Sequence, residues 1–147
     1  MRENRPRSVL FLASAVLLVI GCQLQQPNIS GIWNGSTQLS WEKGPKGAPG
    51  SVHMDGVKLT LNQNGDAITG TLSAGGQFAI TSGTLSKGSL KFSANALQGG
   101  TPMELTFHGK VAGTSLTGTV DTTAAALGAP GELSSIAITG PLTLTKQ

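Results

Sequence analysis

Several residue types are scarce or missing in this chain: it has no tyrosine, a single cysteine, and no arginine after Arg7. Because Cys22 has no second cysteine to pair with, the fold depends on burial and hydrogen bonding and not on disulfides. The missing arginines remove the planar fork that binds phosphates and carboxylates in two-point contacts. Charged residues make up only 12% of the chain. These absences exclude a disulfide-stapled scaffold and argue against recognition of phosphate-rich partners.

Long apolar runs are equally rare, and the one present lies at the start of the chain. Arg2, Arg5 and Arg7 precede a nearly unbroken apolar stretch over residues 9–20, which Gly21 follows. A basic segment, an apolar segment and a small residue are the three parts of an export signal. About twelve apolar residues are too few for a membrane-spanning helix, which needs roughly twenty. We therefore predict that residues 1–21 form a signal peptide that is removed.

The residues at the end of this signal are Val19-Ile20-Gly21-Cys22. They resemble the lipobox of bacterial lipoproteins, and the resemblance implies that Cys22 carries a diacylglycerol on sulfur and a further acyl chain on its new amino group. Two or three chains hold a protein stably on a bilayer, whereas one does not. Gln23 after the cysteine implies, by the same resemblance, an outer-membrane lipoprotein facing the periplasm. The alternative, a buried cysteine on a core helix, is disfavoured because nothing downstream is predicted to be helical.

Most of the positive net charge of the chain comes from the predicted signal peptide. The formal net charge is +3, but residues 22–147 contain seven lysines against six acids. A nearly neutral domain has no electrostatic basis for binding nucleic acid. We predict three parts: the signal over 1–21, the lipidated cysteine and a tether over 22–29, and a single domain over 30–147, a size typical of one domain.

That domain has the period-two pattern of half-buried strands. Apolar and polar residues alternate over 31–41, and again on both sides of Asn64-Gly65-Asp66, which is a strong hairpin signal. Further hairpins are predicted to turn at 86–89 and 112–115, and Asp55-Gly56 to form a bulge that resets the alternation. The segment 44–50, with three glycines and two prolines, is predicted to be a loop. The alternation and these turns together predict eight strands joined in sequence.

Four of these strands contain an internal glycine, at Gly70, Gly83, Gly118 and Gly140. Glycine weakens a strand, so its recurrence favours strands that bend tightly around a small barrel. An eight-stranded meander also closes without leaving edges. The predicted fold class is all-β: an eight-stranded antiparallel up-and-down barrel after an N-terminal signal helix.

Two short motifs suggest a family. Gly31-Ile32-Trp33 at the start of the domain and Lys146 at its end resemble the structural signature of the calycin barrels, the lipocalins and avidins. The resemblance implies that Trp33 plugs one end of the barrel and that the basic side chain lies across it. Residues 59–72 also resemble the second hairpin of small bacterial lipocalin-like lipoproteins. The absence of tyrosine separates the chain from the avidins, so biotin binding is not carried over.

Residues that commonly carry catalysis are few. His53 and His108 are the only histidines, and both are predicted to point outward. Asp55 shares the face of His53, but a metal site needs three or four converging ligands. Glu42 and Glu104 are isolated, with no second acid to form a catalytic pair. We predict no catalytic residues, no metal, no cofactor and no enzymatic activity.

Two functions remain open. The first is a binding module for a small apolar ligand, with a cavity in the barrel mouth contacted by Trp41, Met54 and Leu39. The second is an envelope structural or protein-interaction module, an inhibitor or assembly accessory, with a filled barrel and no ligand. A hydrolase would require a histidine to meet an acid and a hydroxyl in a cleft, and the outward positions of both histidines argue against it.

Overall fold

The computed structural model describes residues 26–43, 47–98, 100–127 and 133–147. Their regular structure is entirely β, in eight strands. The strands are β1 (Gly31–Trp41), β2 (Gly50–Asn64), β3 (Ala67–Ser73), β4 (Gln77–Ser86), β5 (Ser89–Gln98), β6 (Thr101–Ala112), β7 (Ser115–Leu127) and β8 (Leu133–Lys146). The predicted signal helix and Cys22 lie outside the described residues.

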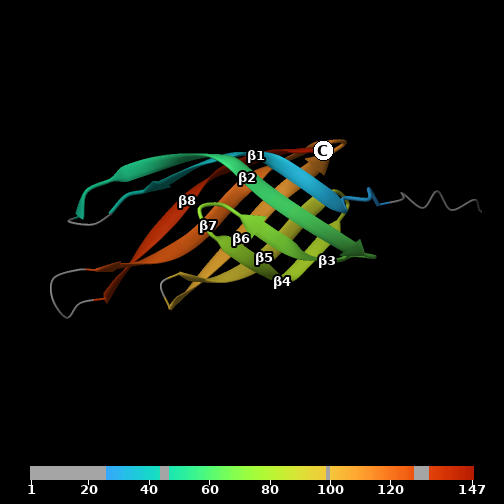
Figure 1. Ribbon diagram of the computed structural model, residues 1–147. Helices are drawn as coiled ribbons and strands as arrows, with labels where there is room; N and C mark the ends of the chain where they lie inside the picture. The colour runs from blue at the N-terminus through green and yellow to red at the C-terminus, as the bar shows by residue number, and fades with distance from the viewer. Residues whose placement is uncertain (1–25, 44–46, 99, 128–132) are drawn as a thin grey trace, which may run out of the picture.

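The eight strands form one closed antiparallel barrel in which each strand pairs with the next and β8 pairs with β1 (Figure 1). This confirms the predicted fold class for the described part of the chain. Three tight hairpins, β2–β3, β4–β5 and β6–β7, turn where the sequence predicts them, and glycines with positive φ stand in all three. These turns lie at one end of the barrel, where β1 begins and β8 ends.

A β-bulge adjusts the long β1–β2 hairpin. The pairing shifts between Gly35 and Thr37 of β1, opposite Asp55 and Gly56 of β2. Gly56 has φ of 70°, a conformation that costs side-chain-bearing residues energy. The predicted bulge at Asp55-Gly56 is thus confirmed, and it keeps the apolar side chains of β2 facing inward on both sides of the irregularity.

The seam between β1 and β8 closes the barrel over only part of its length. Consecutive pairs run from Trp33 opposite Lys146 to Thr37 opposite Leu142, and one further pair joins Ser40 to Thr139. Beyond that point the β1–β2 and β7–β8 hairpins continue as separate ribbons (Figure 1). The barrel therefore has a closed end at the tight turns and an open end where these hairpins diverge.

The glycines within strands allow close approach of neighbouring backbones. A Cβ built on Gly70 would overlap the carbonyl oxygen of Thr60, and one on Gly140 would overlap that of Gln38. Gly118 faces the ring of Phe107 in the same way. The recurrence of glycine therefore has a steric cause, since the strands of this narrow barrel leave no room for a side chain at these points.

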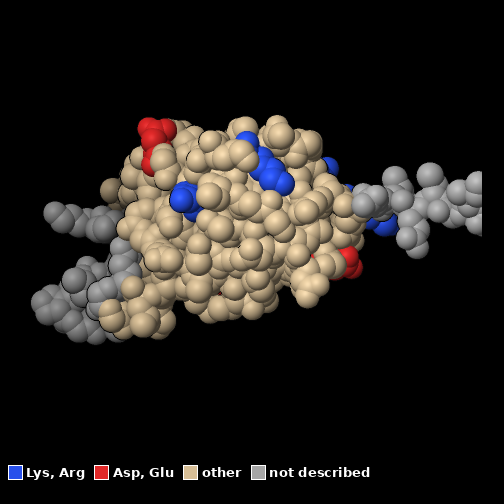
Figure 2. Space-filling model, turned by 45° about the vertical axis from the view of Figure 1, so that its right-hand side comes forward, with Lys and Arg blue, Asp and Glu red and all other residues tan. Residues whose placement is uncertain are grey.

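Inward-facing residues build one continuous apolar core, with Trp33, Leu59, Leu85, Leu90, Phe107 and Leu116 completely buried. The stacked rings of Phe92 and Phe107, with centroids 5.0 Å apart, lie within it. Outside, charged side chains are sparse, and most of the surface seen in Figure 2 belongs to uncharged residues. Among the described residues there is no helix of the length and apolarity that a membrane span requires.

Candidate functional site

Trp33 fills the closed end of the barrel. Its side chain is fully buried, and the indole Nε1–H donates a hydrogen bond of 2.9 Å to the backbone carbonyl of Ile29. A buried indole N–H left without a partner would cost free energy, so this bond satisfies the one polar group of the ring. Trp33 is thus packed at the closed end with its one polar group hydrogen-bonded.

The segment before β1 completes this end. Ile29 is only 1% exposed, its backbone N–H donates to Gln63 Oε1 at 2.8 Å, and Gln26 Nε2 donates to the carbonyl of Leu85 at 2.8 Å. The sequence predicts a tether over residues 22–29. In the structure Gln26 and Ile29 are bonded to the barrel wall, so the packed domain includes residues before Ser30.

Lys146 lies against the indole ring of Trp33, which plugs the closed end. It pairs with Trp33 across the β1–β8 seam, and its Nζ is 5.8 Å from the centroid of the indole ring and donates to the carbonyl of Asn28 at 3.0 Å. Within about 6 Å a cation is attracted to the face of an aromatic ring. Gly31 has φ of 128°, and a Cβ there would lie 3.3 Å from Lys146 Cε, so a larger residue would crowd the lysine.

The open end contains a cavity of about 250 Å³ inside the barrel. Its wall takes side chains from all eight strands and from the β3–β4 turn, and none of the lining residues among those described carries a charge. They are Thr37, Leu39, Met54, Val57, Leu72, Ala74, Gly75, Gly76, Gln77, Phe78, Ala96, Leu97, Met103, Leu105, Val120, Thr122, Ile138 and Leu142.

Side-chain volume explains why this end is hollow. On the inward face of β5, Leu90 and Phe92 lie in the packed core towards the closed end, whereas Ala96 lines the cavity at the open end. The β3–β4 turn adds Ala74 and two glycines to the cavity wall. The alternation of the strands is the same at both ends, but small residues at the open end do not reach across the barrel.

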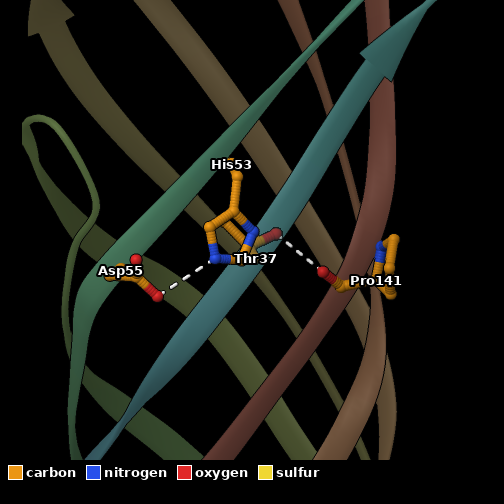
Figure 3. A network of polar contacts seen from close by, with 4 residues as sticks. All are labelled: Thr37, His53, Asp55 and Pro141. Atoms are coloured by element: carbon orange, nitrogen blue, oxygen red, sulfur yellow. Dashed lines mark hydrogen bonds and ion pairs between the residues drawn. The ribbon is translucent and has the colours of Figure 1, made fainter.

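The cavity wall is mainly apolar: besides the exposed Gln77, its polar side chains are two threonines whose hydroxyls are already engaged. Thr37 is 4% exposed, and its Oγ1–H donates to the carbonyl of Pro141 at 2.7 Å (Figure 3). Thr122 Oγ1–H donates to the carbonyl of Glu104 at 2.7 Å. With these protons used within the wall, neither hydroxyl offers a free donor to a ligand in the interior.

A second hollow of about 700 Å³ lies next to the cavity, where β1 separates from β8. We call it the outer cleft. Its lining residues are Ser40, Trp41, Glu42, Lys43, Glu104, Thr106, Asp121, Thr122, Thr123, Ser135, Ile136, Ala137, Ile138 and Thr139. Thr122 and Ile138 line both the cavity and the outer cleft, so the two hollows adjoin.

Trp41 belongs to the outer cleft and not to the cavity wall. It pairs with Gly50 across the β1–β2 hairpin, and a Cβ on Gly50 would lie 2.6 Å from Cζ2 of the indole. The ring therefore covers the glycine, an aromatic-on-glycine arrangement that stabilises a weak strand position. The partly exposed indole remains available to the cleft.

The structure brings two of the three predicted ligand-contacting residues into one wall. Leu39 and Met54 both line the cavity, and Trp41 lies in the adjoining cleft. Met103 and Ala96 also line the cavity, although they are not among the predicted ligand contacts. Their inward alternation is visible in the sequence, but the difference between filled and hollow levels of the barrel is not.

The two histidines lie outside both hollows. His53 Nε2 is 3.0 Å from Asp55 Oδ1 on the outer face of β2 (Figure 3), with both side chains mainly exposed. His108 is exposed on β6. Across the described ranges no three His, Cys, Asp or Glu side chains converge as metal ligands do. The His53–Asp55 contact is a surface pair, which contributes little to stability.

Comparison with known proteins finds no matching family model, curated protein or solved structure. What can be stated of the class therefore comes from the architecture itself. The eight-stranded, all-antiparallel closed barrel is compatible with a calycin-like fold.

Proposed function

We propose that this protein is a lipid-anchored lipoprotein of the bacterial envelope whose barrel binds a small apolar molecule. The observation that carries the proposal is the uncharged cavity of about 250 Å³ at the open end, walled by all eight strands. Concave, mostly apolar sites with few polar groups are the usual form of small-molecule pockets. Binding without catalysis is part of the proposal, because the exposed His53 and His108 lie outside both hollows.

The anchor in this proposal is Cys22, and it rests on the lipobox resemblance. Cys22 is four residues before Gln26, whose side chain is bonded to the closed end. A chain extends at most about 3.6 Å per residue, so an anchor at Cys22 would lie within about 15 Å of that end. The mouth would then face away from the membrane that holds the lipid chains, in our proposal the outer membrane, and open to the periplasm.

The runner-up, a filled barrel acting through its outer surface on an envelope protein, is less well supported. It requires an interior without usable space, whereas the open end contains the cavity. A purely structural barrel would gain stability from larger side chains at Ala96 and Gly76, since filled interiors retain more van der Waals contact.

Native mass spectrometry tests the binding function. The chain from Cys22 onward, produced in a bacterial envelope and released gently, is expected to carry an added mass that denaturation removes. The matched control is Ala96→Leu, which fills part of the cavity and is expected to lose that mass. A bare protein mass in both would contradict the binding proposal and favour the interaction module.

The anchor is tested separately. Cys22→Ser is expected to remove the lipid mass and release the protein from the membrane fraction, because no acylated residue remains. If Cys22→Ser stays in the membrane fraction and its mass differs from that of the unsubstituted protein only by the exchanged side chain, lipidation is contradicted. This result would not affect the cavity proposal.

A further inference from the structure

We infer that the ligand is a single-chain amphiphile without negative charge, with its hydrocarbon tail in the cavity and a hydroxyl-rich head group in the outer cleft. This inference rests on the proposed binding function and goes beyond it by assigning the outer cleft to the same ligand. It follows from two hollows of opposite character that share Thr122 and Ile138 in their walls.

The cavity accepts a tail but not an anionic head. Its described lining contains no lysine, arginine or histidine. The hydroxyl groups of Thr37 and Thr122 donate their hydrogen bonds to backbone carbonyls. A carboxylate moved into such a site would lose its hydration without gaining a cation or a free hydroxyl donor, and the exposed Gln77 amide would be its neutral side-chain donor. A hydrocarbon chain loses nothing polar on entry and is stabilised by every methylene it buries.

The outer cleft has the complementary chemistry. Glu42 and Glu104, which the sequence predicts to be isolated acids, both line it together with Asp121, against a single lysine, Lys43, among the described residues. Serine and threonine side chains from four strands fill much of the remaining wall. Carboxylates accept hydrogen bonds from hydroxyl groups and repel other anions. A sugar-like head group would supply donors to these acceptors, whereas a carboxylate or phosphate head would meet an excess of like charge.

Trp41 supports the same assignment by its place in the cleft. The indole lies over Gly50 and is partly exposed to the solvent-filled space beside the carboxylates. An amphipathic ring next to polar acceptors suits a ligand region that has both apolar and hydroxyl-bearing faces. The β1–β8 pairing ends at Ser40 and Thr139, and the proposal places the junction of head and tail beyond this pair.

The test compares three probes with the same twelve-carbon chain, each used below its micellar concentration at pH 8: dodecyl maltoside, dodecanoate and dodecanol. Binding to the chain from Cys22 onward is measured by isothermal titration calorimetry. Dodecyl maltoside is expected to bind about tenfold more tightly than dodecanoate, since one unit of like charge at about 4 Å in water already costs roughly fivefold. Equal or tighter binding of dodecanoate would overturn the inference.

A pair of charge reversals locates the head group. Glu104 lies in the outer cleft, and Asp66 lies in the exposed β2–β3 turn at the closed end. Glu104→Lys is expected to raise dodecanoate affinity by about five- to tenfold, since it exchanges a repulsion for an attraction. Asp66→Lys makes the same change of charge far from the cleft and is expected to leave all three affinities unchanged. Equal effects of the two substitutions would overturn the assignment of the head to the cleft.

The probes also separate failure of this inference from failure of the proposed function. If none of the three binds, both the apolar-ligand function and the inference fall. If all three bind with equal affinity, the cavity binds hydrocarbon and only the head-group assignment falls. A cationic fourth probe, dodecyltrimethylammonium, that bound more tightly than the maltoside would overturn the hydroxyl-rich head.

Discussion

The closed and open ends of this barrel share the same strands but differ in how their interiors are used. At the closed end Trp33 and Ile29 are buried and tied together by a hydrogen bond, with Lys146 over the indole. At the open end the wall includes Ala96 of β5 and Gly76 of the β3–β4 turn, and a cavity remains. Alternation decides which side chains face inward, and their volume decides whether the level is filled.

The largest expected difference between the ends concerns the two tryptophans. Trp33→Ala removes a fully buried ring and the hydrogen-bond partner of Ile29, and we expect it to lower the free energy of unfolding by about 3–5 kcal/mol. Trp41→Ala removes a partly exposed ring from the cleft, with an expected loss of about 1 kcal/mol. Urea unfolding followed by circular dichroism measures both.

Trp33→Phe provides the control, because it keeps an aromatic body in the plug while removing the indole N–H, and an intermediate loss is expected. If Trp33→Ala and Trp41→Ala cost the same, the distinction between a packed and a hollow end would not hold.

A smaller effect is expected from one substitution made at two neighbouring inward positions of β5. Ala94 is completely buried in the packed core, so Ala94→Leu must displace its neighbours and is expected to cost about 1–3 kcal/mol. Ala96 lines the cavity, so Ala96→Leu extends into empty space and is expected to change stability by less than about 1 kcal/mol, with stabilisation as the favoured sign. Thermal and urea unfolding of the two variants give the comparison.

The pair also links packing to binding. Ala96→Leu should reduce ligand capture while leaving the fold intact. A variant Ala96→Leu as unstable as Ala94→Leu would show that the open end is packed like the closed end.

The smallest expected effect concerns Lys146. Lys146→Met keeps a long side chain over the indole but removes the charge and the hydrogen bond to Asn28, and a loss of about 0.5–1 kcal/mol is expected. Lys110→Met, an exposed lysine on β6, serves as the matched control with an expected change near zero. Equal urea midpoints for the two variants would contradict a stabilising role of Lys146 against the Trp33 indole.

Local features of the fold were predictable because they depend on local chemistry. Asn64-Gly65-Asp66 specifies a tight turn whatever surrounds it, and Gly56 allows the positive φ that the bulge requires. The inward alternation of Leu39 and Met54 likewise identified part of the cavity wall. Ile29 was missed as a core residue because it precedes the periodic pattern of β1, and its backbone is bonded to Gln63, which lies 34 positions away.

By itself, the sequence determined the strand order, the turns and the side of each strand that faces inward, since these follow from backbone preferences and a period of two. Only the tertiary structure decided that the hydroxyl groups of Thr37 and Thr122 donate to backbone carbonyls within the wall. It also decided that the cavity and the outer cleft share Ile138 in their walls. The physical reason is closure: the β1–β8 seam brings together residues about a hundred positions apart, such as Thr37 and Pro141, which hydrogen-bond across 104 positions.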